Sequence, residues 1–209
     1  MNNLILASTS PRRKELLEFL GVPFEVVPSP FEEDRVRFED FDEPADFVAT
    51  RAVGKALALV DEYPDAIILG ADTDVFFDGK VFSKPADLDE AREILKTLRG
   101  NTHEVVTAYS LINPLTNERL TNAVSSLVEF FPFSDEELER YISTSEPLGK
   151  AGAYAIQMGA KSFVRQVQGS LSNVVGLPLT EVADALEAFG IPIDVDVRAI
   201  EEEHFQHVT

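Results

Sequence analysis

The chain has 209 residues, of which 44% are hydrophobic and 26% are charged, a composition typical of a globular protein that excludes collagen-like and disordered chains. Its 18 Lys and Arg against 37 Asp and Glu give a formal net charge of −19, which argues against general DNA or RNA binding because such binding needs a basic face. The sequence has no cysteine for disulfides or thiolate metal sites, and no apolar run approaches the ~20 residues that span a bilayer, so we expect a soluble, cytoplasmic protein without a membrane segment.

Strand-like runs alternate with helix-like segments along the chain, which predicts an α/β fold. In the first half, Ser10-Pro11 followed by leucines predicts an N-capped helix. The elements expected there are a strand over 4–7, this helix from Pro11, a strand over 24–29, an acidic loop over 31–46, a helix over about 45–60, and a strand from 65 that continues into a hairpin at Asp78-Gly79.

In the second half, Asp87 with Glu90 and Ser134 with Glu137 each have the spacing of a capping box. The expected elements are a helix over 87–100, an antiparallel pair of strands over 103–114 and 122–133, a helix to about Ser143, a strand over 162–169, a helix over 177–190, and a polar tail from about 191. No internal repeat or composition shift divides the chain, so we expect residues 1–209 to form a single domain.

The first helix starts with an unusual concentration of positive charge. Arg12, Arg13 and Lys14 occupy its first turn, where the helix dipole disfavours cations. Together with Ser8 and Ser10 they offer hydroxyls, helix-start amides and guanidiniums that could hold a polyphosphate. The alternative is a solvated helix end that Ser10 merely caps, and the motif alone does not decide between the two.

Asp72 follows the apolar run "AIILGA", so a carboxylate emerges where a buried strand meets solvent. This position suits a general base or a ligand of a divalent metal ion. Strand alternation places Asp74 on the same face as Asp72 if the strand continues that far, although a turn before the hairpin would equally explain Asp74.

The remaining candidates are weaker when each is taken alone. Lys84 in "FSKP" and the group Glu32, Glu33 and Lys55 have the composition of ordinary solvated surface. In "GKAGAYAIQMGA", Lys150 could meet a charged group, Tyr154 could stack or belong to the core, and Gln157 could meet the edge of a base with a donor and an acceptor. His103 opens a strand and is interpreted as structural.

Seven blocks in chain order carry a resemblance to a known family: "LASTSPRRKELL", "RAVGKA", "ILGADTDV", "FSKP", "GNTHEVVTA", "EPLGKAGAYAIQ" and "GSLSNVVGLPL". From about residue 3 to 190 the chain resembles the Maf family of nucleoside triphosphate pyrophosphatases, also called septum formation inhibitor proteins. The resemblance implies a mixed α/β fold, with an elongated sheet, flanking helices and two lobes around a central cleft, related to the inosine triphosphate pyrophosphatases. It also implies cleavage between the α and β phosphates to give a monophosphate and pyrophosphate, with Mg²⁺ or Mn²⁺ as cofactor.

The same resemblance implies roles for individual residues. Asp72 would activate water and contribute to the metal site, where Glu33, or its neighbour Glu32, would help hold the ion. The substrate-binding residues would be Ser8, Arg12, Arg13, Lys55 and Lys84 for the triphosphate, and Thr73, Lys150 and Gln157 for the base and its surroundings. A homodimer is expected from the resemblance alone.

Within the family, Arg12, Thr73 and the block "KAGAYAIQ" are similar to the branch acting on dTTP, UTP and modified pyrimidine nucleotides, and differ from the 7-methyl-GTP branch. Three positions depart from the family pattern: Gly149 in place of Asp, Asp74 in place of an apolar residue, and Met158 in place of Gly. The Gly149 departure leaves open an alternative function, a catalytically weak nucleotide-binding regulator of cell division. Asp74 adds a negative charge beside Asp72, which would raise the pKa of that carboxylate or recruit a metal ion.

Overall fold

The computed structural model describes residues 3–205. In this part of the chain, seven strands form one mixed sheet in the order β2-β1-β3-β5-β6-β7, and β4 pairs with the distal end of β3. β2, β1 and β3 run parallel, whereas β5, β6 and β7 continue the sheet antiparallel. The strands are β1 (Asn3–Ala7), β2 (Phe24–Val26), β3 (Ala66–Phe77), β4 (Lys80–Phe82), β5 (Thr102–Asn113), β6 (Glu118–Phe130) and β7 (Val164–Gln168). The mixed α/β prediction is thus confirmed.

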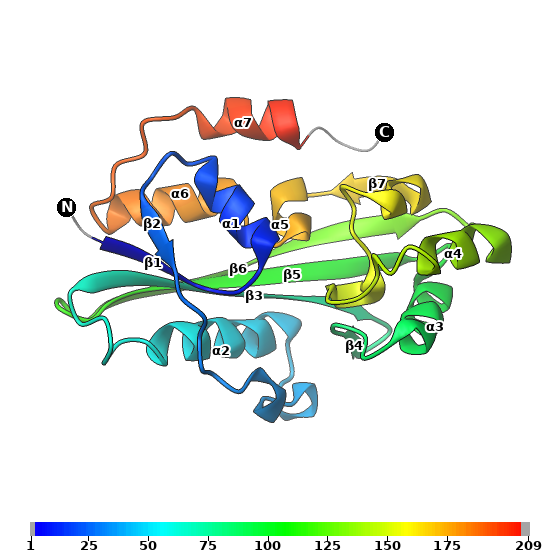
Figure 1. The fold of residues 1–209 in the computed structure, drawn as a ribbon, viewed down its shortest axis with the longest axis horizontal. Helices are drawn as coiled ribbons and strands as arrows, with labels where there is room; N and C mark the ends of the chain where they lie inside the picture. Colours follow the sequence, from blue (N-terminus) through cyan, green and yellow to red (C-terminus); the bar gives the residue numbers. More distant parts are fainter. Residues whose placement is uncertain (1–2, 206–209) are drawn as a thin grey trace.

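Helices cover both faces of the sheet (Figure 1). One helix, α2, packs beneath β3 and β5, while α1, α5 and α6 lie on the opposite face and α3 and α4 lie at one end. The helices are α1 (Pro11–Glu18), α2 (Pro44–Leu57), α3 (Leu88–Leu98), α4 (Asp135–Ile142), α5 (Leu171–Val175), α6 (Leu179–Ala188) and α7 (Val197–His204). Short 3₁₀ helices occupy Glu33–Arg35, Phe38–Asp40, Ala151–Ala153 and Gly159–Phe163. None of the described helices is long and apolar enough to cross a membrane.

The two central strands are the most deeply buried part of the sheet. Ten of the 12 residues of β3 and nine of the 12 of β5 are buried, because helices cover both of their faces. The long β5–β6 pair and the hairpin at Asp78-Gly79 form as predicted, but β6 begins at Glu118 and ends at Phe130, just before Pro132, four and three residues earlier than expected. β2 ends at Val26, before Pro28, which cannot donate to the sheet.

The predicted helix starts differ in how fully they form. Ser10 caps α1 by accepting from the Arg13 amide, and Ser134 and Glu137 make both bonds of a capping box. Asp87 accepts from two amides at the start of α3, but the Glu90 carboxylate binds the amide of Ala86. The predicted capping box at α3 is therefore wrong in one bond, because Glu90 accepts from the amide of Ala86 and not from that of Asp87.

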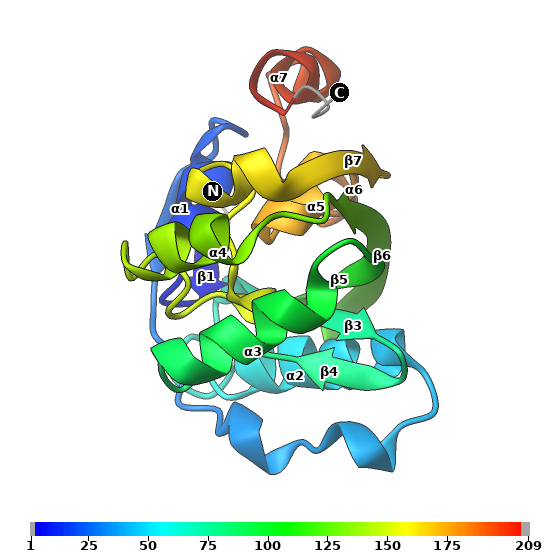
Figure 2. The same ribbon diagram turned by 90° about the vertical axis from the view of Figure 1, so that its right-hand side faces the viewer.

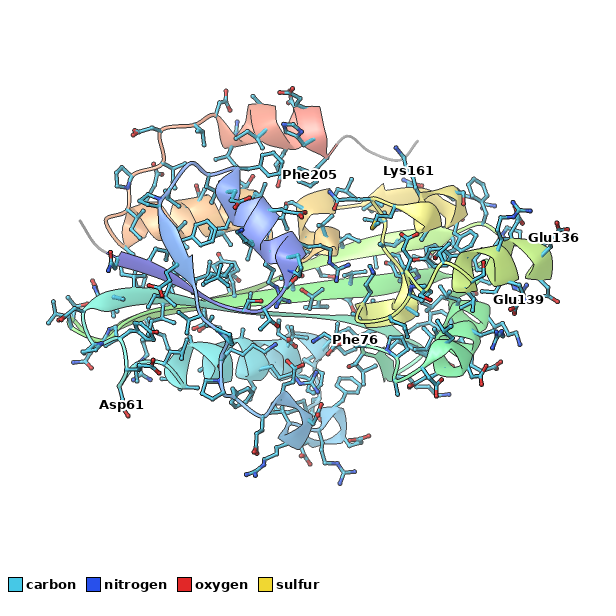
Figure 3. The ribbon with its side chains drawn as sticks, in the orientation of Figure 1. Asp61, Phe76, Glu136, Glu139, Lys161 and Phe205 are labelled. Carbon is cyan, nitrogen blue, oxygen red and sulfur yellow. The ribbon has the colours of Figure 1, made fainter. Side chains whose placement is uncertain are left out.

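The polar tail expected from about residue 191 contains a helix. α7 is capped by Asp196, and in Figure 2 it forms an outer layer beyond α6. Phe205, labelled in Figure 3, is only 5% exposed and lies 5.8 Å from the ring of Phe19 in α1. The prediction was wrong because a short apolar stripe anchors this segment to the main core. The short helix α5 was also not predicted.

Candidate active site

A cleft of about 1040 Å³ brings together residues from eight separate stretches of the chain. Its lining includes every residue that the sequence singled out for substrate or metal: Ser8, Arg12, Arg13, Glu32, Glu33, Lys55, Asp72, Thr73, Lys84, Lys150 and Gln157. The parallel pairing of β1 with β3 explains part of this arrangement, since Ala7 is in register with Gly70. The loop that begins at Ser8 and the end of the apolar run before Asp72 therefore meet at one edge.

On one side of the cleft, the start of α1 presents two arginines in different environments. The Arg13 guanidinium is 9% exposed and donates to the carbonyl of Gly176 at 2.9 Å and to the hydroxyl of Thr73 at 3.0 Å. Burial lowers the pKa of Arg13, and the nearby negative charge of Asp72 opposes that shift. Arg12 lies in the cleft with no ion pair to any residue among 3–205, and burial together with Arg13 lowers its pKa. Lys14 instead forms an exposed pair with Glu18.

On the other side, one ammonium group joins two carboxylates. Lys55 Nζ lies 2.5 Å from Asp72 Oδ1 and 2.5 Å from Glu33 Oε2, and Lys84 Nζ approaches Glu33 at 3.1 Å. Burial would raise the pKa of Glu33, but the charges of Lys55 and Lys84 hold it at about 2. Glu33 is therefore ionised at neutral pH. Glu32 differs from its neighbour, because it is exposed and pairs with Arg35.

The position of Lys55 depends on a close approach between α2 and β3. A Cβ atom added at Gly70 would lie 2.3 Å from the carbonyl oxygen of Ala52 and 2.8 Å from the amide nitrogen of Ala56. Glycine is thus the residue that lets the helix backbone lie directly on the strand. The same approach lets side chains of α2 reach the carboxylate of Asp72.

Asp74 lies outside the cleft lining, on the α2 face of β3, and is 2% exposed. Burial raises the pKa of Asp74, the charge of Asp72 adds to this effect, and Arg51 opposes it from 2.8 Å. The sequence left open whether the strand continues to Asp74 or a turn begins there. The strand continues, so Asp72 and Asp74 share a face. Arg51 was not anticipated, although it stands one helical turn before Lys55, a spacing that could have pointed to it.

The segment 148–158 lines a further part of the cleft. Lys150 donates to the carbonyl of Glu146, and burial and the charge of Arg12 lower the pKa of Lys150. Gln157 is exposed and makes no hydrogen bond within the described chain, so its amide is available to a ligand. Gly149 has φ +72°, and an added Cβ would meet nothing within 4 Å. The departure from Asp there therefore leaves open space and creates no clash.

Tyr154 belongs to the core, which decides one of the two alternatives left open by the sequence. Its hydroxyl shares a hydrogen bond of 2.9 Å with His103 Nε2, and its ring centre lies 5.0 Å from that of Phe130. Both side chains are buried, at 5% and 1% exposure. His103 is structural, as predicted, and burial lowers its pKa to about 3.

The donor atoms of the cleft fit a hydrated divalent cation. No group of three or more Asp, Glu, His and Cys side chains suited to a metal ion occurs among residues 3–205, which argues against an all-protein cage. Glu33 and Asp72 nevertheless both contact Lys55 Nζ, so their carboxylates lie close together, and Asp72 Oδ2 is buried with no hydrogen-bond partner among residues 3–205. Mg²⁺ characteristically binds one or two carboxylates and completes its shell with water and phosphate oxygens.

Comparison with known proteins identifies the family of the chain. The family model described as Maf-like protein matches residues 3–189. The chain is 45% identical to the dTTP/UTP pyrophosphatase of Geobacter sp. (strain M21), over 90% of this chain and 96% of the relative. It is 44% identical to the enzymes of the same name from Syntrophus aciditrophicus (strain SB), over 90% of each chain, and Symbiobacterium thermophilum (strain DSM 24528 / JCM 14929 / IAM 14863 / T), over 92% and 97%.

A solved structure, that of the Staphylococcus aureus Ham1 protein, overlaps 63% of this chain and 73% of its own with a TM-score of 0.42 and 14% identity. The assignment rests on the sequence relatives, which match nearly the whole chain at much higher identity. The chain belongs to the Maf-like protein family.

Proposed function

We propose that the protein hydrolyses dTTP, UTP and modified pyrimidine nucleoside triphosphates to the monophosphate and pyrophosphate, with Mg²⁺ or Mn²⁺ as cofactor. The observation that carries this proposal is the division of the cleft into two sides. The guanidiniums of Arg12 and Arg13, which form no ion pair with any residue among 3–205, lie in the same cleft as a pair of carboxylates held by Lys55. The relatives' name, dTTP/UTP pyrophosphatase, supports the choice of substrates.

The triphosphate would bind at the start of α1. A triphosphate carries about four negative charges, and a chain of net charge −19 can attract it only where its cations are concentrated. Arg12 is free of ion pairs within residues 3–205, and Arg13 is oriented by Gly176 and Thr73. Ser8 and the helix amides add neutral donors. A bound triphosphate would thus neutralise the positive charge of Arg12 and Arg13 in the first turn of α1.

The carboxylate side would hold the metal ion and supply the base. Glu33 and Asp72 would be the protein ligands, and the ion would supply Lewis-acid stabilisation of the negative charge on the phosphate oxygens. Asp72 would accept the proton of the attacking water as the new O–P bond forms and pyrophosphate leaves. Lys55 and Lys84 would offset charge on the transferred group. Because Lys84 is exposed, its contact with Glu33 can exchange for a phosphate.

The base would lie against the segment 148–158. The Gln157 amide can pair with the edge of a pyrimidine, and Leu148 and Met158 offer exposed apolar surface at the same part of the cleft. Lys150 lines the same cleft within the range of the charge of Arg12, so it would lie near the junction of base and phosphates. A homodimer remains an expectation from the family resemblance.

A nucleotide panel with product identification tests this function. The protein is incubated with the eight common nucleoside triphosphates and with 5-substituted pyrimidine triphosphates, in Mg²⁺ and in Mn²⁺, and products are resolved by chromatography. Monophosphate and pyrophosphate in equal amounts from dTTP and UTP are expected. Orthophosphate as the product, or no turnover of any nucleotide, would overturn the proposal. Tight nucleotide binding by calorimetry without turnover would support the regulator alternative.

A further inference from the structure

Arg51 lies in α2, and its guanidinium approaches two carboxylates and one backbone carbonyl beside the cleft. Its Nη1 atom lies 2.8 Å from Asp74 Oδ2 and 3.8 Å from Asp72 Oδ2, and its Nη2 atom donates to the carbonyl of Val36 at 3.2 Å. The guanidinium also lies over the ring of Phe47, 4.2 Å from the centroid. Phe47 packs edge-on against Phe76, labelled in Figure 3, so the platform beneath Arg51 is itself part of the core.

The bond to Val36 connects Arg51 with Glu33. Val36 directly follows the 3₁₀ helix Glu33–Arg35, and its amide donates to the carbonyl of Glu33 at 3.1 Å. A guanidinium that holds the Val36 carbonyl therefore restrains the end of the turn that carries Glu33. Arg51 thus links the backbone of one carboxylate ligand to the side chain of the other.

Asp74 determines how close Arg51 comes to Asp72. Asp72 Oδ1 accepts a hydrogen bond from Lys55, whereas Oδ2 has no hydrogen-bond partner within residues 3–205. At 3.8 Å, Arg51 is near enough to favour the charge of Oδ2 but too far to donate a hydrogen bond to it. The shorter pairing with Asp74 uses the Nη1 donor that would otherwise turn toward Oδ2. Asp74 consequently keeps one oxygen of Asp72 without a protein donor.

We propose that Arg51 and Asp74 are positioning residues that align the carboxylates of Asp72 and Glu33 for the divalent cation and keep Asp72 Oδ2 from accepting a hydrogen bond from Arg51. The proposal rests on the proposed function. It assigns the pair a role beyond that of a buried ion pair in the core.

The decisive variant replaces the ion pair by an apolar pair, Arg51→Leu with Asp74→Val. It leaves the net charge unchanged, and a buried ion pair replaced by packed apolar residues usually keeps or gains stability. We expect an unchanged or higher thermal midpoint, a kcat about 10- to 100-fold lower, and a KM for dTTP within about threefold of the original. Mn²⁺ affinity, measured by electron paramagnetic resonance with the α,β-imido analogue of dTTP bound, should fall by about tenfold or more.

The matched control is Arg99→Leu with Asp135→Val, the same exchange at a pair that lies outside the cleft lining, with 2.6 Å between its charged atoms. It should change neither kcat nor Mn²⁺ affinity. A double variant of Arg51 and Asp74 that retains both quantities would reduce the pair to a structural role and overturn the inference. Absence of turnover by the unmodified chain would contradict the proposed function, whereas this outcome leaves that function intact.

Arg51→Lys is the second variant, in case the apolar pair prevents folding. A lysine keeps the charge opposite Asp74 but cannot hold Asp74 and the Val36 carbonyl in one planar fork. We expect kcat and Mn²⁺ affinity to decrease by about threefold to tenfold, with the thermal midpoint within a few degrees of the original. Unchanged values of both would count against the inference.

Discussion

The guanidinium of Arg13 donates to the carbonyl of Gly176 at 2.9 Å, and this bond joins residues that are 163 positions apart in the chain. Gly176 ends α5, and Arg13 is in the first turn of α1, so the bond fixes the start of α1 relative to the sheet face on which α5 lies. A cation in the first turn of a helix is disfavoured by the helix dipole, but here a backbone carbonyl satisfies one of its donors. The remaining donors are directed to the cleft and to Thr73.

Replacing Arg13 by alanine should impair turnover much more than replacing Lys14. A lost charge-assisted hydrogen bond corresponds to about 1.5–3 kcal/mol, so kcat/KM for dTTP should decrease by about 10- to 150-fold in Arg13→Ala. Lys14→Ala removes only an exposed pair with Glu18 and should change kcat/KM by less than about twofold. Steady-state kinetics measure both values, and equal effects of the two changes would exclude a phosphate role for Arg13.

Asp72→Asn should abolish most turnover and retain nucleotide binding. An amide cannot accept the proton of water, so kcat should decrease by about 10²- to 10⁴-fold. The dissociation constant for the α,β-imido analogue of dTTP, measured by calorimetry in Ca²⁺, should change by less than tenfold. The control is Asp61→Asn, which alters an exposed carboxylate outside the cleft lining, labelled in Figure 3. Unchanged kcat in Asp72→Asn would show that another group is the base.

Glu33→Gln should increase the Mn²⁺ concentration that gives half the maximal rate. The amide keeps the shape of the side chain but loses the charge that faces Lys55 and Lys84. We expect an increase of about tenfold or more, since loss of a carboxylate ligand weakens a site that has only two. Glu32→Gln is the control, because Glu32 pairs with Arg35 at the surface. Equal responses of the two variants would contradict the assignment of Glu33.

The sequence predicted Asp72 and Ser8 as cleft residues because each follows an apolar run. The parallel pairing of β1 with β3 brings the two together, although Asp72 lies within β3 and not at its end. Arg51 could not be placed in this way, because an arginine on a helix is ordinarily solvated, and its burial depends on Asp74 and the carbonyl of Val36. These partners come from separate segments, so only the folded chain brings them together.

The last helix was missed for a different reason. Residues 201–204 are polar, and they obscure an apolar stripe at Val197, Ile200 and Phe205, all of which pack against the main core. A stripe of three residues gives little periodic signal in a sequence. The tertiary contacts with α1, and not local propensity, therefore decide that this segment is a helix.

Buried His103 should make stability depend on pH. Burial lowers the pKa of His103 to about 3, below its ordinary value of 6.5, so between these values the unfolded chain binds a proton that the folded chain does not. Its contribution to stability is full above pH 6.5 and decreases as pH falls, by about 1.4 kcal/mol per pH unit. The difference in unfolding free energy between the original chain and His103→Gln should narrow at this rate from about pH 6 to 5.

Urea denaturation at several pH values measures that difference. His204→Gln is the matched control, because it changes an exposed histidine at the end of α7. Other acidic groups titrate equally in the original chain and in each variant, so they cancel in the comparison. A difference between the original chain and His103→Gln that stays constant from pH 7 to 5 would mean that His103 is protonated in the folded state.

Phe205 should contribute to stability although it lies beyond the matched family region, which ends at residue 189. Its ring is 5% exposed and contacts Phe19 of α1, so Phe205→Ala removes a buried aromatic side chain that joins α7 to the helix carrying Arg13. We expect the free energy of unfolding to decrease by about 3 kcal/mol, at the lower end of the range for buried phenylalanine, because α7 is an outer layer. Leu115→Ala, at a side chain that is 72% exposed, should change it by less than about 0.5 kcal/mol. Urea denaturation measures both, and equal small effects would show that α7 does not stabilise α1.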